Sequence, residues 1–387
     1  MTPETKKGWC PGALRPMPTG DGLLLRVKPS GGRMTLGAAA MLADLAERRG
    51  NGILEISQRA NLQLRGMAES GLSAVWNGLA AHGLIDADPE IEAVRNVMVS
   101  PLSDLDPEAV CDLAPHVAAW EAQLARDARL RKLPAKFSVA LDAGGRFALR
   151  EGAHVTARAG RRGWDIFTVD EIAPVRVAHD ALTETVGRIA LDIAARGLPA
   201  MLGDGDESAL ALGALALGTI HVAILAPPLG RVRAEVLAAL LLEAAQLGAR
   251  DMRLMPRRRL ALTGLDAKGA ARLCERAQAL GLIVSGDDRR LAVVACAGKP
   301  ACASAARDSQ ADALSLAQEL PRAAGIILHV SGCAKGCAHA APTRLTLVAT
   351  LDGYDAIFRG RADGAPALRH LTFDAARRLV AQECRGP

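Results

Sequence analysis

The sequence has 387 residues, of which 50% are hydrophobic and 23% charged, so it can form two ordinary domains and is too apolar for a disordered chain. Aromatic residues make up only 3%, which argues against a surface that binds nucleic-acid bases by stacking. The formal net charge is +5, and only 8 of the 47 basic residues are lysine. This arginine excess is typical of GC-rich coding, but it also suits a protein that binds several carboxylates through guanidinium forks.

The N-terminal residues lead to Gly8-Trp9-Cys10-Pro11 without an apolar stretch, so no signal peptide is visible and we expect a cytoplasmic protein. In that compartment, eight cysteines indicate thiols or metal ligands rather than a disulfide framework. Residues 210–226 are nearly all apolar and about as long as the shortest membrane span. We interpret them instead as a helix or loop followed by a buried strand, because they lead into a repeated unit.

The chain repeats itself. Residues 23–100 match residues 221–298 at a constant offset of 198, with Arg59 aligned with Arg257 and Gly66 with Gly264. Matched glycines and a matched arginine at one offset are hard to obtain from composition alone. The period is far too long for a solenoid repeat, so we predict two homologous halves related by a pseudo-twofold axis.

Each half has the same predicted element order. The first has a strand at 22–27, a helix at 36–48, strands at 52–57 and 61–65, and a helix that leads to Gly83. The second has the corresponding elements at 222–225, 234–247, 251–255 and 260–263, and a helix that leads to Gly281. This order predicts an α+β fold with two ferredoxin-like half-domains, at 8–82 and 205–280.

An α/β segment is expected after each half-domain, at 83–200 and at 281–387. Residues 133–141 and 341–348 look equivalent, since each has a proline, then a basic residue and an alternating strand. A molecule with pseudo-twofold symmetry is expected to have a cleft along its axis, where a large ligand can bind.

Two cysteine pairs stand out, Cys296 with Cys302 and Cys333 with Cys337, each in a loop of small residues after an apolar strand. Four thiolates on tight loops are what a 4Fe-4S cluster needs. A structural zinc is the main alternative, although its pairs usually have shorter spacers, and four free buried thiols are a third. The other cysteines have no partner pattern and are expected to be ordinary thiols, the first of them left open: Cys10, Cys111, Cys274 and Cys384.

This cysteine pattern, after a duplicated ferredoxin-like module, resembles the siroheme-dependent nitrite and sulfite reductase superfamily over essentially the whole chain. Segments 58–63, 95–97 and 133–137 resemble its basic strands, which hold the macrocycle carboxylates and the small anion. The resemblance implies a 4Fe-4S cluster on the four paired cysteines. Together with the arginine content, it gives these candidate substrate-binding residues: Arg59, Gln63, Arg65, Arg95, Lys136 and Arg257.

Within the superfamily, residues 8–17 and 20–26 are most similar to the precorrin-3B synthase family of aerobic cobalamin biosynthesis. That resemblance implies a monooxygenase that hydroxylates precorrin-3A at C20 with dioxygen and closes a γ-lactone. NADH would be its electron source. No G-x-G-x-x-G motif follows a strand, so we expect the electrons to arrive through a partner reductase. No nucleic-acid or membrane partner is expected.

Two alternatives stay open. One is a siroheme-dependent nitrite or sulfite reductase. Sulfite reductases place a basic residue two positions after the strand lysine, where this chain has Ser138. The loss of that cation weakens the case for a sulfite reductase more than for a nitrite reductase, because nitrite carries a single charge. The other is a non-catalytic iron–sulfur protein that carries a tetrapyrrole or electrons.

Oxygen activation is not assigned to any residue. A 4Fe-4S cluster does not by itself hydroxylate carbon, so the resemblance leaves room for a mononuclear non-haem iron. The sequence shows no motif of two histidines and one carboxylate for it, and we expect the histidines of the cysteine-bearing half to be structural: His329, His339 and His370.

Overall fold

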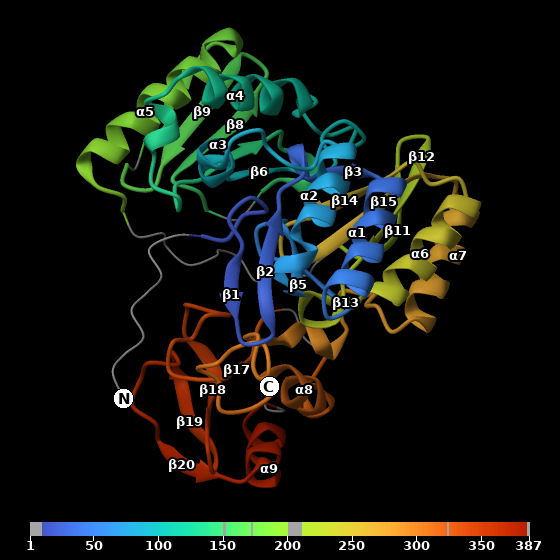
Figure 1. Ribbon diagram of the computed structural model, residues 1–387, viewed down its shortest axis with the longest axis vertical. Helices are drawn as coiled ribbons and strands as arrows, with labels where there is room; N and C mark the ends of the chain where they lie inside the picture. Colours follow the sequence, from blue (N-terminus) through green and yellow to red (C-terminus); the bar gives the residue numbers. More distant parts are fainter. Residues whose placement is uncertain (1–9, 150–151, 172, 200–210, 323–324, 385–387) are drawn as a thin grey trace.

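The computed structural model describes residues 10–149, 152–171, 173–199, 211–322 and 325–384. The ends of several expected ranges, at 8–9, 200, 205–210 and 385–387, lie outside the described residues. Within the described ranges the chain forms four five-stranded sheets. Figure 1 shows an α/β segment at either end of the molecule, with the two ferredoxin-like sheets between them. The predicted α+β fold with an internal duplication is confirmed.

The two ferredoxin-like sheets, named sheet A and sheet B here, have the same strand order. Sheet A contains β1 (Met17–Thr19), β2 (Gly22–Val27), β5 (Leu62–Met67), β4 (Ile53–Ile56) and β13 (Arg231–Arg233). Sheet B contains β11 (Gly213–Leu217), β12 (Ile220–Leu225), β15 (Arg259–Leu265), β14 (Asp251–Met255) and β3 (Arg33–Thr35). The expected strand at 222–225 is therefore present, but the apolar stretch before it is a hairpin strand and not a helix or loop.

The two halves exchange an edge strand. β13 of the second half pairs antiparallel with β4 in sheet A, and β3 of the first half pairs antiparallel with β14 in sheet B. Each half therefore completes the sheet of the other. This exchange could not be predicted, because strands of three residues are too short to show an alternating pattern.

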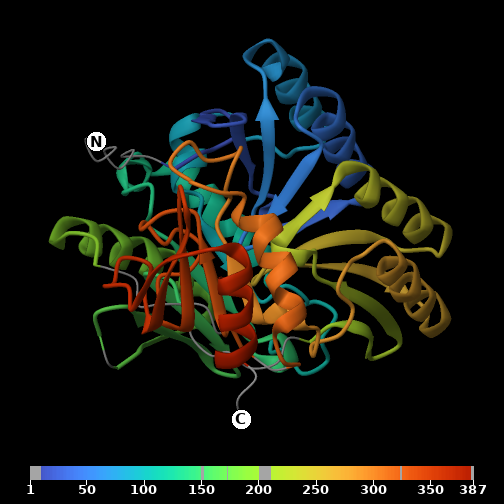
Figure 2. The ribbon, with the colours of Figure 1, turned by 90° about the horizontal axis from the view of Figure 1, so that it is seen from below.

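Four helices cover the apolar faces of these sheets and join them into one core. They are α1 (Leu36–Arg49) and α2 (Leu72–Ala81) on sheet A, and α6 (Ala234–Gln246) and α7 (Ala267–Ala279) on sheet B. Helices α1 and α6 lie side by side, and Figure 2 shows the four helices along one side of the molecule. Fully buried leucines from both halves meet in this core, among them Leu54 and Leu240.

Alternation along the strands gives sheet A one apolar and one polar face. Leu25 and Leu54 point into the shared core, whereas their neighbours Arg26 and Glu55 lie on the opposite face. Gln63 of β5 is on the polar face as well, directly opposite both residues in the strand register. The polar face is where the site described below is built.

The two α/β segments, with sheets C and D, also share one topology. Sheet C contains β10 (Val175–Val177), β9 (Gly163–Thr168), β8 (Val155–Gly160), β7 (Val139–Asp142) and β6 (Val97–Val99). Sheet D contains β20 (Leu368–Leu371), β19 (Gly353–Gly360), β18 (Thr343–Thr350), β17 (Leu328–Ser331) and β16 (Val293–Ala295). Helices α4 (Ala114–Arg126) and α5 (Leu182–Arg196) pack on sheet C, α8 (Ser309–Leu316) and α9 (Phe373–Glu383) pack on sheet D, and the short α3 (Pro89–Val94) precedes β6.

The expected equivalence of residues 133–141 and 341–348 is wrong. Strand β7 lies between two parallel neighbours, β6 and β8, and so does β17, between β16 and β18. Strand β18 has one parallel and one antiparallel neighbour, so its counterpart is β8. A proline followed by an alternating stretch does not determine where a strand lies in a sheet, because that depends on its partners.

None of the helices in the described residues is long and apolar enough to cross a membrane.

Candidate functional site

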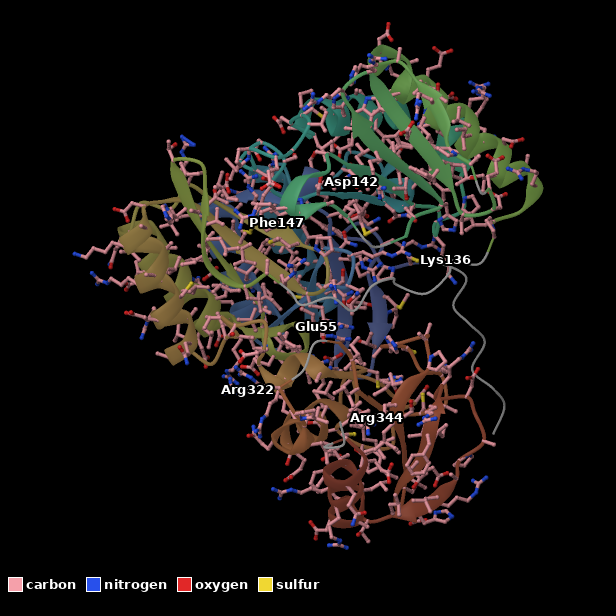
Figure 3. All side chains as sticks on the ribbon, turned by 180° about the vertical axis from the view of Figure 1, so that it is seen from behind. Glu55, Lys136, Asp142, Phe147, Arg322 and Arg344 are labelled. Carbon is pink, nitrogen blue, oxygen red and sulfur yellow. The ribbon has the colours of Figure 1, made fainter. Side chains whose placement is uncertain are left out.

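A cavity of about 540 Å³ opens between the polar face of sheet A and the start of sheet C. Three of its lining residues are cations, and none of the described residues that line it is acidic. The lining consists of Cys10, Arg26, Arg59, Asn61, Asn96, Val97, Met98, Ala135, Lys136, Ser138, His154, Leu198 and Pro199. Figure 3 shows Lys136 at the edge of the sheet C segment that faces the sheet D segment.

Positive charge is crowded around this cavity. Burial lowers the pKa of Arg26. The Cys10 side chain partly offsets this decrease, and the charge of Arg59 adds to it. Burial, with Arg26 and Arg95 nearby, also lowers the pKa of Lys28 to about 8. Cations that destabilise one another in a partly buried space are stabilised by an added anion. The cavity is therefore suited to a ligand that carries carboxylates.

One wall of the cavity is a hydrogen-bonded chain of Arg59, Ser138 and His154. Arg59 Nη1 donates to Ser138 Oγ at 3.2 Å, and the Ser138 backbone N–H donates to His154 Nδ1 at 3.2 Å. The Ser138 hydroxyl lies 3.0 Å from the same nitrogen. Burial lowers the pKa of His154, and the charge of Arg59 lowers it further. A hydrogen bond to the Pro199 carbonyl raises the pKa but does not outweigh these two effects. A neutral hydroxyl–imidazole pair thus stands where the resemblance places a cation in sulfite reductases.

Lys136 is held at the cavity by Asn96. The Asn96 side-chain amide donates to the Ala135 and Phe137 carbonyls, at 3.0 and 2.9 Å, on either side of Lys136. Lys28 Nζ in turn donates to Asn96 Oδ1 at 2.8 Å. The two sequence segments around Asn96 and Lys136 therefore lie side by side.

Two of the predicted arginines lie in internal ion pairs. Arg95 Nη2 is 2.8 Å from Asp86 Oδ2, and Arg95 Nη1 is 3.2 Å from Glu121 Oε1. Burial opposes the charge, but these carboxylates raise the pKa of Arg95. Arg95 lines a small space of about 10 Å³, enough for roughly one water. Arg65 Nε lies 2.8 Å from Glu55 Oε2. Neither arginine is among the residues that line the large cavity.

The repeat-related arginines approach each other through their turns. The backbone N–H of Arg257 donates to the Gln58 carbonyl at 2.9 Å, so the turn that carries Arg257 lies beside the one that carries Arg59. Arg257 has a φ of 63°, in the left-handed region. Its side chain is not among those that line the cavity, whereas that of Arg59 is.

The four paired cysteines, called the four-cysteine site below, come together at one edge of sheet D. Strands β16 and β17 are adjacent and parallel, so the loops that follow them lie at the same edge. Cys296 follows β16 and Cys333 follows β17 after one glycine. Burial, and then the proximity of the three other cysteines, raise the pKa of Cys337. The four thiols therefore lie near one another, where the two loops meet.

The loops around the four-cysteine site are closely fitted. The Gly332 N–H donates to Cys296 Sγ at 3.1 Å. A Cβ at Gly332 would lie 2.7 Å from Ala305 Cβ and 3.0 Å from Ser309 Oγ, so a larger residue does not fit there. An amide that donates to a ligating thiolate is one of the ways in which a protein tunes an iron–sulfur cluster.

The donor set fits a cluster better than a single ion. Within the described residues, no three His, Cys, Asp or Glu side chains are grouped closely enough to hold one metal ion. A structural zinc ion draws its four ligands into one closed tetrahedron. A 4Fe-4S cluster is larger and takes one thiolate at each iron, so two neighbouring loops with two cysteines each can hold it. Within the part of the chain that the structure describes, no group of three His, Cys, Asp or Glu side chains is placed to bind a mononuclear iron either.

Sheet A and the four-cysteine site are in direct contact. The Gly20 N–H in the β1–β2 turn donates to the Ala301 carbonyl at 3.1 Å, and a Cβ at Gly20 would clash with the Pro300 carbonyl oxygen. Arg231 Nη2 on β13 donates to the Ala297 carbonyl at 3.2 Å. The exchanged strand therefore ties the polar face of sheet A to the residue next to Cys296.

The pseudo-symmetric position on sheet B is closed. A cluster of apolar side chains, including Leu102, Phe147 and Met255, covers the face of sheet B that corresponds to the cavity. Figure 3 shows Phe147 over sheet B, well away from Lys136. Of the two repeat-related positions, as far as the structure describes the chain, the one on sheet A is therefore open and the one on sheet B is covered.

His154 was missed by the sequence analysis. It lies 16 residues after Ser138, just before β8, and reaches Ser138 because β7 and β8 are parallel neighbours. No local motif connects the two residues, so only the strand pairing could have identified the histidine.

Comparisons with known proteins agree with this architecture. The model of the nitrite/sulfite reductase ferredoxin-like half-domain matches residues 15–82. The NirA protein of Mycobacterium tuberculosis has the same fold, with a TM-score of 0.72 at 18% identity over 94% of this chain and 82% of that one. A ferredoxin–nitrite reductase of Zea mays is 26% identical, but over only 40% of this chain and 29% of its own.

A further relative matches nearly from end to end. Precorrin-3B synthase of a Sinorhizobium species is 33% identical to this chain, over 94% of this chain and 85% of its own length. The chain spans most of that relative, whereas it shares only part of its length with the nitrite reductase. On these grounds the chain belongs to the precorrin-3B synthase family, within the superfamily that shares the nitrite/sulfite reductase half-domain.

Proposed function

We propose that this protein is the oxygenase that converts precorrin-3A to precorrin-3B. In that reaction one oxygen atom of O₂ becomes the C20 hydroxyl group, and the ring A acetate closes a γ-lactone. The second oxygen atom leaves as water after two electrons and two protons are supplied. The observation that carries the proposal is a cavity lined by three cations and no acid among the described residues, on a sheet that contacts the four-cysteine site, in a chain of this family.

The cavity residues supply the binding. Arg26, Arg59 and Lys136 would pair with the acetate and propionate carboxylates of the macrocycle, and Asn96 keeps Lys136 in place. Charge-assisted pairs of this kind are stronger when several act on one rigid ligand, because the ligand is ordered only once. Without the ligand the neighbouring cations repel one another, and binding of an anionic ligand relieves that repulsion.

The four-cysteine site would hold a 4Fe-4S cluster, which passes on electrons one at a time. Its residues act by holding and tuning that group: the Gly332 amide donates to Cys296 Sγ, and Arg231 fixes the adjacent carbonyl. NADH would be the ultimate electron source, through a partner reductase. A second, mononuclear iron for oxygen activation stays a proposal without ligands in the described residues.

The neutral wall formed by Ser138 and His154 supports the oxygenase over a sulfite reductase. A small dianion is bound best by several cations, and at this point the cavity offers a hydroxyl group and an imidazole whose pKa is lowered. A hydroxyl and a neutral imidazole can instead donate and accept protons next to a macrocycle, as oxygen reduction requires.

The test compares two activities on one anaerobically purified preparation. We expect precorrin-3A to be consumed when air and reductant are supplied, and no ammonium to form from nitrite with the same reductant. We also expect the visible spectrum to show an iron–sulfur cluster without the strong bands of siroheme. Siroheme bands together with nitrite reduction would replace the oxygenase proposal with the reductase alternative.

A further inference from the structure

Four side chains form a polar row across sheet A. In the strand register Arg26 of β2 is opposite Gln63 of β5, Gln63 is opposite Glu55 of β4, and Glu55 is opposite Arg231 of β13. With its amide oriented to satisfy both neighbours, Gln63 donates to Glu55 Oε2 at 3.1 Å and accepts from Arg26 Nη2 at 3.2 Å. Glu55 Oε1 accepts from Arg231 Nε. The row is therefore hydrogen-bonded from end to end.

The two ends of the row lie at the two parts of the site. Arg26 lines the cavity, and Arg231 donates to the Ala297 carbonyl, beside Cys296. Figure 3 shows Glu55 at the boundary between the ferredoxin-like part and the sheet D segment. The row is therefore a continuous line of hydrogen bonds between the cavity and the four-cysteine loop.

Glu55 keeps its charge within the row. Burial opposes ionisation, but Arg65 and Arg231 outweigh it and lower the pKa of Glu55. Its side chain is only 15% exposed, so these charges are weakly screened. A change of charge at Arg26 is therefore felt along the row, because each member is held by the next.

The second half of the molecule lacks such a row. At the repeat positions of Arg26, Gln63 and Glu55, sheet B has Ile224, Ala261 and Arg253. Only Arg33, the counterpart of Arg231, is kept, and it pairs with Asp104 and Asp112. The row thus occurs on the sheet that has the cavity and is missing from the sheet whose cavity is closed.

We propose that this row couples substrate binding in the cavity to the redox state of the four-cysteine site, with Gln63, Glu55 and Arg231 as positioning residues. The inference rests on the proposed function. A substrate carboxylate that pairs with Arg26 adds negative charge at one end of the row. It weakens the hold of Arg26 on Gln63, and the adjustment passes through Glu55 to Arg231.

The sign follows from electrostatics. Added negative charge disfavours a further electron at the four-cysteine site, so the substrate binds more tightly to the oxidised protein than to the reduced one. By linkage the substrate lowers the reduction potential by the same free energy. A tenfold affinity ratio corresponds to 59 mV for a one-electron couple. With substrate bound, the site is then the stronger reductant, so electrons leave it toward oxygen chiefly when there is a macrocycle to hydroxylate.

The test uses anaerobic holoprotein, so that no turnover occurs. Precorrin-3A is titrated against the oxidised and the chemically reduced protein, and the reduction potential is measured with and without it. We expect a ratio of about tenfold in favour of the oxidised form, and a potential lowered to match. Gln63→Met keeps the side-chain volume but removes both hydrogen bonds, and it should reduce the ratio to below about threefold.

Two further variants make the test specific. Arg231→Lys keeps the charge but loses the guanidinium fork that joins Glu55 to Ala297, so it should reduce the affinity ratio as Gln63→Met does. It therefore tests the coupling independently if Gln63→Met folds poorly. Arg33→Gln, at the matching position in sheet B, should keep the full ratio.

The outcomes separate the two proposals. Binding of precorrin-3A with equal affinity in the two redox states, or an unchanged ratio in both row variants, would overturn the coupling and leave the proposed function standing. If precorrin-3A binds in neither redox state, the proposed function fails and the coupling fails with it.

Discussion

Replacing Arg59 by lysine tests where the macrocycle binds. Arg59 lines the cavity and already uses Nη1 to hold the Ser138 hydroxyl at 3.2 Å. A lysine at this position keeps the positive charge but offers a single ammonium in place of a planar fork. It cannot hold Ser138 and a carboxylate oxygen in the same geometry.

The expected loss is one charge-assisted hydrogen bond. Such a bond contributes about 1.5–3 kcal/mol, and about 1.4 kcal/mol corresponds to a tenfold change in affinity. We therefore expect Arg59→Lys to weaken precorrin-3A binding by at least about tenfold, with the cluster spectrum unchanged. Arg257→Lys makes the same change at the repeat position, where the side chain does not line the cavity, and should bind within about twofold of the unaltered protein.

The assay is an equilibrium binding titration at fixed ionic strength, because salt weakens charge pairs at an open cavity. Arg48→Lys serves as a surface control, since the Arg48 side chain is 72% exposed and pairs with Asp44 on its own helix. If Arg59→Lys binds precorrin-3A as tightly as the Arg48 control, the macrocycle does not lie in this cavity, even if the cluster assignment is right.

Three further predictions concern the cluster, the core and the pH dependence of stability. Alanine at any one cysteine of the four-cysteine site should remove the cluster's visible absorption, which Cys111→Ala should leave intact; bound zinc without iron or sulfide would contradict this. Leu54→Ala, at a fully buried position of the shared core, should cost about 2–5 kcal/mol of unfolding free energy in urea titrations. Burial, with His339 and Arg258 nearby, lowers the pKa of His329 to about 4. As the pH falls, this histidine is therefore protonated near pH 6.5 in the unfolded chain but stays neutral in the folded protein until near pH 4. Stability should thus fall by about 2 kcal/mol between pH 7 and pH 5 in urea titrations, and less in His329→Gln; equal losses in both would refute that assignment.

Much of the fold could be predicted from the sequence because its signals are local or periodic. The duplication showed as matched glycines at one offset, and the strands and helices of each half showed as alternation and helical periodicity. The cysteines could be assigned to one site because each pair lies in a short loop after an apolar strand. None of these inferences required knowing which distant segments meet.

The rest depended on partners far away in the chain. The edge strands β3 and β13 are exchanged between halves, and His154 reaches Ser138 only through a parallel pairing. The arginines were the hardest to assign, because an arginine is equally able to bind a ligand or an internal carboxylate. Arg95 is held by Asp86 and Glu121, and no sequence pattern indicated that those acids would lie beside it.

The origin of the oxygen in the product tests the proposed oxygenase reaction most directly. Precorrin-3A is incubated with the holoprotein and reductant, once with oxygen gas labelled with oxygen-18 and once with labelled water, and the product is examined by mass spectrometry. We expect one labelled atom from the gas and none from the water, because the hydroxyl oxygen comes from O₂ and the lactone oxygen from the ring A acetate. A product that takes its oxygen from water, or unchanged precorrin-3A beside nitrite reduction, would contradict it.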